Sequence, residues 1–219
     1  MKCFISRELE DWADVITACA DLPVQWHCQS LIRLTPLSFE LPRGDFDWVF
    51  FSSKEAVKSF FSIQPPSHHL KFAAIGKATA RALATHVQPS FIGQSKDTQE
   101  VGKSFAQHIG AAKVLFPISD ISLRTIQQQL PAEQVLDLIV YSTAHVEVII
   151  PEKDLYIFTS PSNVEAYFNH NQLPQKAQIA AFGASTASHL SRFTDKTVVI
   201  LDHPDPRKMA AAIKQNFLR

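Results

Sequence analysis

The 219-residue chain is predicted to be an α/β protein built from two similar lobes, each with a parallel sheet covered by helices. Two observations support this prediction. Short runs of β-branched and aromatic residues alternate along the chain with helical segments, which is typical of parallel sheets with helices on both faces. In addition, one stretch of the chain occurs twice, so the two lobes are expected to derive from an internal duplication.

The duplication relates residues 47–83 to residues 154–190 in a single register without a gap, because 154 − 47 = 107 and 190 − 83 = 107. Each copy is predicted to run as strand, hydroxyl-rich turn, helix, second strand ending in Gly, and second helix. The same residue type stands in both copies at first-copy positions Asp47, Phe51, Ser53, Val57, Phe61, Ala73, Ala74, Gly76, Thr79, Ala80 and Leu83. Eleven matches in one fixed register indicate duplication rather than chance.

The segment before the first copy is predicted to form a strand at 2–6, a helix at 8–22 and a strand at 25–34. The helix is indicated by apolar residues at helical spacing, from Trp12 to Cys19, and it is expected to stop at Pro23. Residues 35–43 contain two prolines and are predicted to be a linker.

The first copy extends to about residue 86 and the second copy fills residues 154–193. Segment 134–150 is predicted to be extended, because it is rich in β-branched residues and lacks a helical period. The remaining expected elements are a strand at 89–92, a helix at 98–109, a strand at 113–116, a helix at 122–130, a strand at 197–201 and a helix at 206–218.

The domain boundaries follow from the position of the duplication. The first 34 residues supply a strand, a helix and a strand, but they contain no copy of the repeat. Assigning them to the second copy gives one lobe of residues 1–34 plus 148–219 and another of residues 35–147. The chain would then cross between the lobes twice.

Both copies are predicted to present a helix N-terminus at the carboxyl end of a strand. Ser160 is expected to be an N-cap with Pro161 at the first helical position, and Ser52 and Glu55 have the spacing of a capping box. Ligands of open α/β sheets bind at the carboxyl ends of strands, and helix N-termini favour anions. The sequence therefore predicts an anionic ligand that contacts both copies.

The composition excludes several other classes of protein. Lys plus Arg equals Asp plus Glu at 21 each, so no overall field attracts nucleic acid or an anionic membrane. The N-terminus lacks an apolar stretch typical of a signal peptide or a membrane span, so a cytoplasmic protein is expected. A monomer is expected as well. The three cysteines, Cys3, Cys19 and Cys28, lack metal or redox spacing and are expected to be buried reduced thiols. No histidine spacing predicts a metal, and no glycine-rich loop predicts a nucleotide.

Five segments, taken together and in this order, resemble the uroporphyrinogen-III synthase family: residues 51–57, 74–80, 140–143, 158–164 and 181–187. The resemblance extends from Phe4 to the last helix. It implies a cofactor-free enzyme of tetrapyrrole biosynthesis, with two flavodoxin-like lobes, a two-stranded connector and a cleft between the lobes. Such enzymes close hydroxymethylbilane, a linear polycarboxylate, into uroporphyrinogen III with loss of water and inversion of the last pyrrole ring.

The resemblance also implies which residues contact the substrate. Tyr141 is the candidate catalytic residue, because a phenol can assist the departure of water; packing of its ring is the alternative interpretation. The resemblance carries over Ser53, Thr79, Ser160 and Thr186 as candidate substrate-binding residues. Arg7 and Lys54 are added because each follows a strand and could reach a carboxylate, with a solvated surface role as the alternative interpretation. The candidate set is completed by Gly76, Ser162, Gly183 and Ser185. For the serines and threonines the alternative interpretation is helix capping alone.

Two other functions remain open at the level of the sequence. One is a two-lobed protein that binds an anion or a sugar phosphate without catalysis. The other is a nucleotide-processing α/β enzyme, which would require a phosphate-binding loop that the sequence lacks.

Overall fold

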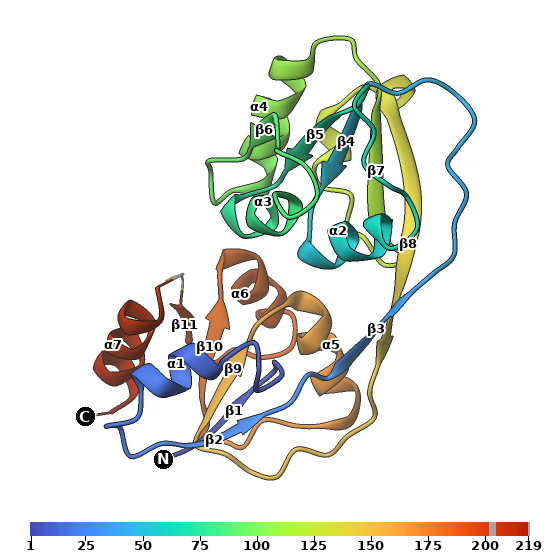
Figure 1. Ribbon diagram of the computed structural model, residues 1–219. Helices are drawn as coiled ribbons and strands as arrows, with labels where there is room; N and C mark the ends of the chain where they lie inside the picture. The colour runs from blue at the N-terminus through green and yellow to red at the C-terminus, as the bar shows by residue number, and fades with distance from the viewer. Residues whose placement is uncertain (202–204, 219) are drawn as a thin grey trace. The chain divides into compact units, whose positions relative to one another are not determined.

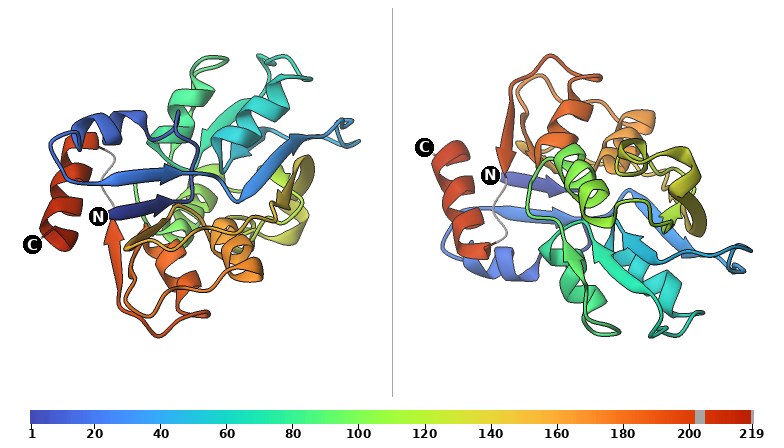
Figure 2. Two further views of the ribbon diagram at one scale, coloured as in Figure 1. Left: turned by 90° about the horizontal axis from the view of Figure 1, so that it is seen from below. Right: turned by 90° about the horizontal axis from the view of Figure 1, so that it is seen from above.

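The computed structural model describes residues 1–201 and 205–218, and the chain divides into two compact units (Figure 1). Unit 1 consists of Met1–Arg33 and Ala144–Arg219, and unit 2 consists of Leu34–Thr143. Met1 and the last helix both belong to unit 1. Figure 2 marks the N-terminus and draws the last helix in red. No helix within the described residues combines the length and the apolar character needed to cross a membrane.

Unit 1 contains a five-stranded sheet in the order β11-β10-β9-β1-β2, and every neighbouring pair is parallel. Counted along the chain this is the order 2-1-3-4-5 of flavodoxin-like proteins. The pairing of β1 with β9 confirms that the N-terminal strands join the sheet of the second repeat copy. The strands are β1 (Lys2–Ile5), β2 (Gln25–Cys28), β9 (Leu155–Phe158), β10 (Gln178–Phe182) and β11 (Val198–Leu201).

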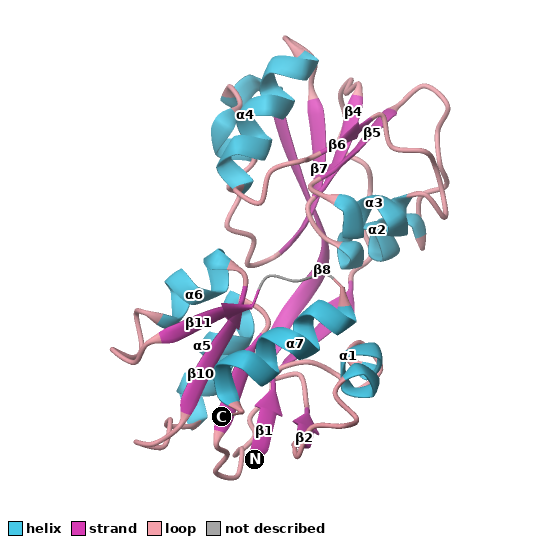
Figure 3. Ribbon diagram, turned by 90° about the vertical axis from the view of Figure 1, so that its left-hand side faces the viewer, coloured by secondary structure: helices cyan, strands magenta, loops and turns pink. Residues whose placement is uncertain are grey.

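Helices cover both faces of this sheet. Successive side chains of a strand point to opposite faces, so each strand packs against helices on both sides. Cys3 and Ile5 pack in one core cluster with α1 (Ala13–Ala18) and α7 (Pro206–Phe217). Phe4, between them, packs in a second cluster with α5 (Pro161–His170) and α6 (Ala184–Leu190). Figure 3 shows the helices on the two sides of the strands.

Unit 2 carries a six-stranded sheet in the order β3-β8-β7-β4-β5-β6. Its helices α2 (Lys54–Phe61) and α3 (Lys77–Leu83) pack on one face, and α4 (Thr98–Ile109) packs on the other. The strands are β3 (Ile32–Pro36), β4 (Trp48–Phe51), β5 (Lys71–Ala74), β6 (Phe91–Ile92), β7 (Val114–Ser119) and β8 (Val135–His145). The neighbouring strands β8, β7, β4, β5 and β6 all pair in parallel.

Strand β3 lies at the edge of this sheet and runs antiparallel to β8. Leu37 N donates to Val140 O at 3.0 Å, and Val146 N donates to Leu31 O at 2.8 Å. Residue numbers thus rise along one strand as they fall along the other, which is the antiparallel arrangement.

The two sheets have the same layout but differ in chain order. Strands β4, β5 and β6 take the places that β9, β10 and β11 have in unit 1, and β7 and β8 take those of β1 and β2. Unit 2 is therefore a circular permutation of unit 1, with β3 added at its edge. The prediction of an α/β protein with two similar parallel sheets is confirmed.

Four expectations about single elements are wrong. The helix expected at 8–22 is reduced to α1, because the preceding loop is held by other contacts, including Ser30 N to the Glu8 carboxylate at 3.2 Å. The strand expected at 25–34 is two strands, β2 and β3, that belong to different sheets. The cap of α2 is Ser53 rather than Ser52, so no capping box with Glu55 forms.

The fourth concerns the helix expected at 122–130, where only the 3₁₀ turn Gln127–Gln129 forms; a second such turn is Ala132–Gln134. Arg124 has a φ of 53°, a left-handed conformation that an α-helix does not contain. Its Nε lies 2.6 Å from Asp137 Oδ2, and Gln127 also binds this carboxylate at 3.0 Å. These contacts with β8 hold the segment in its irregular path.

Candidate functional site

In unit 2, the helices α2 and α3 begin at the carboxyl ends of the neighbouring strands β4 and β5. Ser53 is the N-cap of α2, and its Oγ accepts a hydrogen bond from Ala56 N at 3.0 Å. Gly76 is the N-cap of α3, and Lys54 is exposed at the first position of α2. The free N–H groups of two helix N-termini thus meet one edge of the sheet, where they favour an anion.

The phenol of Tyr141 belongs to this edge of unit 2. Tyr141 lies on β8, with only 9% of its surface exposed, and its Oη is 3.3 Å from Ser53 Oγ. Either hydroxyl can donate in this pair. Its ring packs in the core cluster that contains Phe51 and Phe60, so the packing interpretation also holds. The structure therefore brings the candidate catalytic residue and a candidate binding residue together.

Thr79 and Thr186 occupy equivalent third positions of α3 and α6, and both side chains are buried, at 5% and 2% exposed. Neither helix has a side-chain cap, because its N-cap is a glycine. Within the described residues, neither threonine hydroxyl has a hydrogen-bond partner. The capping interpretation of these two threonines is therefore wrong, and their hydroxyls are uncommitted.

In unit 1, α5 and α6 begin at the carboxyl ends of the neighbouring strands β9 and β10. Ser160 is the N-cap of α5 with Pro161 at the first helical position, as predicted. Ser160 Oγ accepts from Asn163 N at 3.3 Å and from Asn163 Nδ2 at 3.0 Å. Ser162 and Ser185 lie in the first turns of α5 and α6, half-buried and exposed respectively.

Gly183 has a conformation that explains its residue type. Its φ is +88°, in the region that side chains rarely adopt, although a Cβ there would meet open space. Its N–H donates to Leu201 O at 3.2 Å, which holds the start of α6 against the end of β11. The glycine thus permits the sharp turn from β10 into α6.

Arg7 follows β1, and its guanidinium lies 5.8 Å from the centre of the Phe182 ring at the end of β10. The side chain therefore extends across the carboxyl end of β9, which lies between these strands. No carboxylate of the described residues forms an ion pair with Arg7. Its charge is available to an anion at the edge where α5 and α6 begin.

Sequence reasoning missed a pair of hydroxyls between β1 and β9. Thr159 N donates to Ser6 Oγ at 2.9 Å, and Thr159 Oγ1 donates to Ser6 O at 2.6 Å. These bonds fix the carboxyl ends of the two strands where the strand order reverses, the place at which open α/β sheets bind ligands. The available signal was that Ser6 ends a predicted strand and Thr159 directly follows the first strand of the second copy.

The thiols and other metal-ligating groups form no second site. Burial raises the pKa of Cys19 and of Cys28 to about 11 and raises that of Cys3 as well, so the thiols stay protonated at neutral pH. Cys3 and Cys19 are buried as expected, whereas Cys28 is only half-buried. No cluster of three His, Cys, Asp or Glu side chains able to hold a metal occurs among the described residues.

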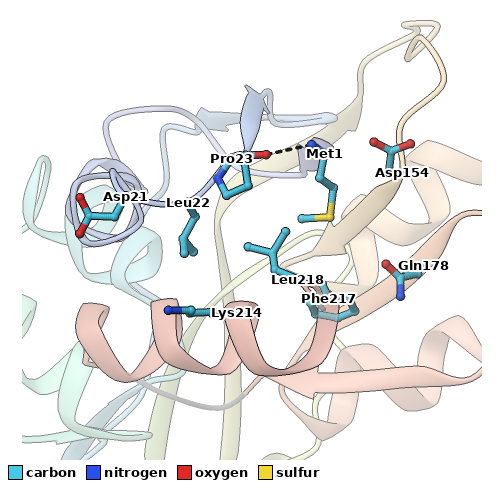
Figure 4. Close-up of a pocket in the computed structure, with 9 residues that line it drawn as sticks. All are labelled: Met1, Asp21, Leu22, Pro23, Asp154, Gln178, Lys214, Phe217 and Leu218. Carbon is cyan, nitrogen blue, oxygen red and sulfur yellow. Dashed lines mark hydrogen bonds between the residues drawn. The ribbon is translucent and has the colours of Figure 1, made fainter.

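A hollow of about 600 Å³ in unit 1 lies away from these residues (Figure 4). Met1, Asp154 and Gln178 line it at the amino ends of β1, β9 and β10, facing the end of α7. The Met1 ammonium donates to Pro23 O at 2.8 Å across its rim. Because the helix N-termini and the candidate hydroxyls are at the carboxyl ends of the strands, this hollow is separate from the candidate site.

Two permuted α/β units, each with helix N-termini and hydroxyls at the carboxyl ends of its strands, define a class of two-lobed α/β proteins suited to anionic ligands. Comparison with protein-family models gives a match to Uroporphyrinogen-III synthase HemD over residues 14–211. This match covers most of the chain, so the protein belongs to the uroporphyrinogen-III synthase HemD family.

Solved structures show the same fold. A uroporphyrinogen-III synthetase from Helicobacter pylori is 18% identical, with a TM-score of 0.70 and coverage of 100% of both chains. A mutant uroporphyrinogen III synthase from Thermus thermophilus is 15% identical, with a TM-score of 0.65 and coverage of 98% of both chains. Comparison with curated protein sequences gives no match.

Proposed function

We propose that the protein is a uroporphyrinogen-III synthase, which closes hydroxymethylbilane into uroporphyrinogen III with loss of water and inversion of ring D. Membership of the HemD family supports a tetrapyrrole substrate. The observation that carries the proposal to a reaction is the contact of Tyr141 Oη with Ser53 Oγ, 3.3 Å apart at the N-terminus of α2.

Substrate binding is assigned to the carboxyl ends of the strands in both units. The bilane carries many carboxylates, and helix N-termini supply N–H donors that are already ordered. The N-termini of α2 and α3, and of α5 and α6, are proposed to bind these carboxylates together with the hydroxyls of Ser53, Ser160, Thr79 and Thr186. Ser162, Ser185 and the cations Arg7 and Lys54 are proposed to add further contacts, with Gly76 and Gly183 leaving room for the approach.

Tyr141 is proposed to assist the departure of the substrate hydroxyl. Ala56 N donates to Ser53 Oγ, so the Ser53 proton is free to be donated to Tyr141 Oη. The phenolic proton then points to the substrate, and donors in such a chain strengthen one another. Loss of the hydroxyl as water leaves an azafulvene cation. The substituted carbon of ring D attacks this cation before the rearrangement that inverts the ring.

The remaining task of the protein is to fold the bilane so that attack at the substituted carbon is faster than head-to-tail closure. Holding reactants in a reactive geometry lowers a barrier without any reactive side chain. The many fixed donors of the strand ends suit this task better than a single strong acid or nucleophile would.

The test is to incubate the protein with freshly prepared hydroxymethylbilane and to separate the porphyrin isomers after oxidation. We expect type III to dominate over the type I isomer of spontaneous closure. A product mixture equal to that of the protein-free control would refute the proposal. Tight binding of the bilane without turnover would instead support the non-catalytic anion-binding alternative.

A further inference from the structure

The side chain of Asn163 connects two parts of unit 1 that have different roles. Its Nδ2 donates to Ser160 Oγ, the cap of α5, at 3.0 Å. Its Oδ1 accepts from Leu31 N at 2.8 Å. Asn163 is 4% exposed and Leu31 is fully buried, so water does not compete for either bond.

Both chain crossings make a backbone contact at Leu31. It lies between β2 and β3, two residues before Arg33, after which the chain enters unit 2. Its carbonyl accepts from Val146 N at 2.8 Å, just after the chain returns at Ala144. The N–H of Leu31 thus binds Asn163 of α5, and its carbonyl binds Val146, which directly follows β8.

The first repeat copy shows that capping does not require this asparagine. In the register of 107, Ala56 corresponds to Asn163, since 163 − 56 = 107. The backbone N–H of Ala56 still donates to Ser53 Oγ at 3.0 Å. A methyl group therefore suffices at this position for the cap, and the amide in the second copy serves the bond to Leu31.

We propose that Asn163 is a positioning residue that couples ligand binding at the N-terminus of α5 to the conformation of the chain crossings at Leu31. The inference rests on the proposed function, which places the substrate at Ser160. A ligand that orders Ser160 also orders the Asn163 amide and so strengthens the bond to Leu31. Coupling of this kind is reciprocal, so the state of the crossings also changes the affinity of the α5 terminus.

The test measures amide hydrogen exchange at Leu31 by NMR, with and without uroporphyrinogen III, the proposed product, kept reduced under anaerobic conditions. In the unaltered protein we expect the ligand to slow exchange at Leu31. In Asn163→Ala we expect exchange without ligand to be faster by roughly fivefold to tenfold, the equivalent of one lost hydrogen bond. The ligand-dependent slowing should disappear, while the helix cap persists.

Two further variants separate coupling from general stability. Asn163→Leu keeps a similar side-chain volume but removes both the donor to Ser160 and the acceptor for Leu31 N, so exchange without ligand should be as fast as in Asn163→Ala and the response to ligand should be lost. Asn216→Ala removes an amide that donates to Ala212 O within α7. This variant should change neither the exchange at Leu31 without ligand nor its response to ligand.

The outcomes distinguish the inference from the proposed function. Ligand binding that leaves Leu31 exchange unchanged, or an unchanged response in Asn163→Ala, would overturn the inference alone. Absence of any ligand-induced shift in the spectrum of the unaltered protein would overturn the proposed function and the inference together. We also expect Asn163→Ala to raise KM more than it lowers kcat in the isomer assay.

Discussion

Removal of the Tyr141 hydroxyl should slow the reaction without changing its product. Tyr141→Phe keeps the ring that packs in the core and deletes only the group 3.3 Å from Ser53 Oγ. General acid catalysis typically contributes about 10²–10⁴-fold, and the bilane also loses water unaided, so we expect the lower end of this range or less. Type III should still dominate, as measured by steady-state turnover and separation of isomers.

The matched control for this variant is Tyr156→Phe. Tyr156 is another buried tyrosine, and its hydroxyl accepts from Lys153 N at 3.1 Å, away from the helix N-termini. The folded Tyr156→Phe variant should therefore have unchanged turnover. Full activity of Tyr141→Phe would reduce Tyr141 to a packing residue, and a shift to type I product would make it a group that positions the substrate.

The two uncommitted threonine hydroxyls should each contribute one hydrogen bond to the substrate. Thr79→Ala and Thr186→Ala should each lower kcat/KM by the loss of one hydrogen bond to a charged group, about 1.5–3 kcal/mol. Thr85→Ala, which removes an exposed hydroxyl bound to Ala82 O after α3, should have no effect. A complete loss of activity in a folded variant would mean that the threonine takes part in the chemistry.

The thiols should behave as protonated groups over the neutral pH range. Because burial raises the pKa of Cys28 to about 11, its thiolate fraction is very small at neutral pH and grows as the pH rises towards that value. Alkylation of Cys28 by iodoacetamide, followed by mass spectrometry, should accelerate about tenfold per pH unit up to this range. The denatured protein should react faster at neutral pH; a rate plateau near neutrality in the folded protein would contradict the assignment.

Local signals predicted single residues well, and distant contacts could not be read from the sequence. Ser160 and Pro161 were identifiable as a cap because a cap depends only on residues three positions away. Ser52 and Ser53 are adjacent serines, and spacing alone favoured the wrong one. The contact of Ser53 with Tyr141 joins residues 88 positions apart, so only the folded sheet brings them together.

At the scale of elements, helices with clear ends were predictable and irregular connections were not. The helix at 98–109 was predicted with the bounds that α4 has, and its Asp97 cap and its Gly110 with a φ of 61° both mark sharp ends. By contrast, β2 and β3 appear as one run of strand-forming residues. Between them, Leu31 N donates to the Asn163 side chain, a contact 132 residues away that the sequence does not reveal.

The cap of α5 gives a prediction at this scale. Ser160→Ala removes the acceptor for Asn163 N and Nδ2, so we expect the free energy of unfolding to fall by about 1 kcal/mol, within a range of roughly 0.5–2. Urea denaturation measures this change. Ser191→Ala at the end of α6, where an exposed hydroxyl binds Ser188 O, should lie within about 0.5 kcal/mol of the unaltered protein. Equal stability of the two variants would show that the Ser160 cap is not stabilising.

At the scale of the molecule, the duplication could be predicted because residue matches in one register survive in the sequence. The permutation of unit 2 could not, because strand order depends on pairing between distant segments. Segments 1–34 and 113–145 share no detected repeat, yet β1-β2 and β7-β8 occupy equivalent places in their sheets. Burial on both faces constrains such strands to be apolar, and many apolar sequences satisfy that constraint.

The same architecture predicts that unit 2 is an independent domain. Both core clusters of unit 2 are built from residues within 34–143, whereas those of unit 1 combine residues from Cys3 to Phe217. A fragment of residues 34–143, which has 143 − 34 + 1 = 110 residues, should therefore fold alone. Its urea unfolding, followed by circular dichroism, should be one cooperative transition with a slope of about 1–3 kcal/mol per molar urea.

A fragment of equal length supplies the control, because length alone can produce partial collapse. Residues 1–110 have the same number of residues but omit β7 and β8 of unit 2 and β9, β10 and β11 of unit 1. Strand β1 then lacks its neighbour β9, and strand β4 lacks its neighbour β7, so both cores stay open and no cooperative transition should occur. If fragment 34–143 unfolded as gradually as fragment 1–110, the stability of unit 2 would depend on unit 1. The domain boundaries near residues 34 and 147 would then have to be abandoned.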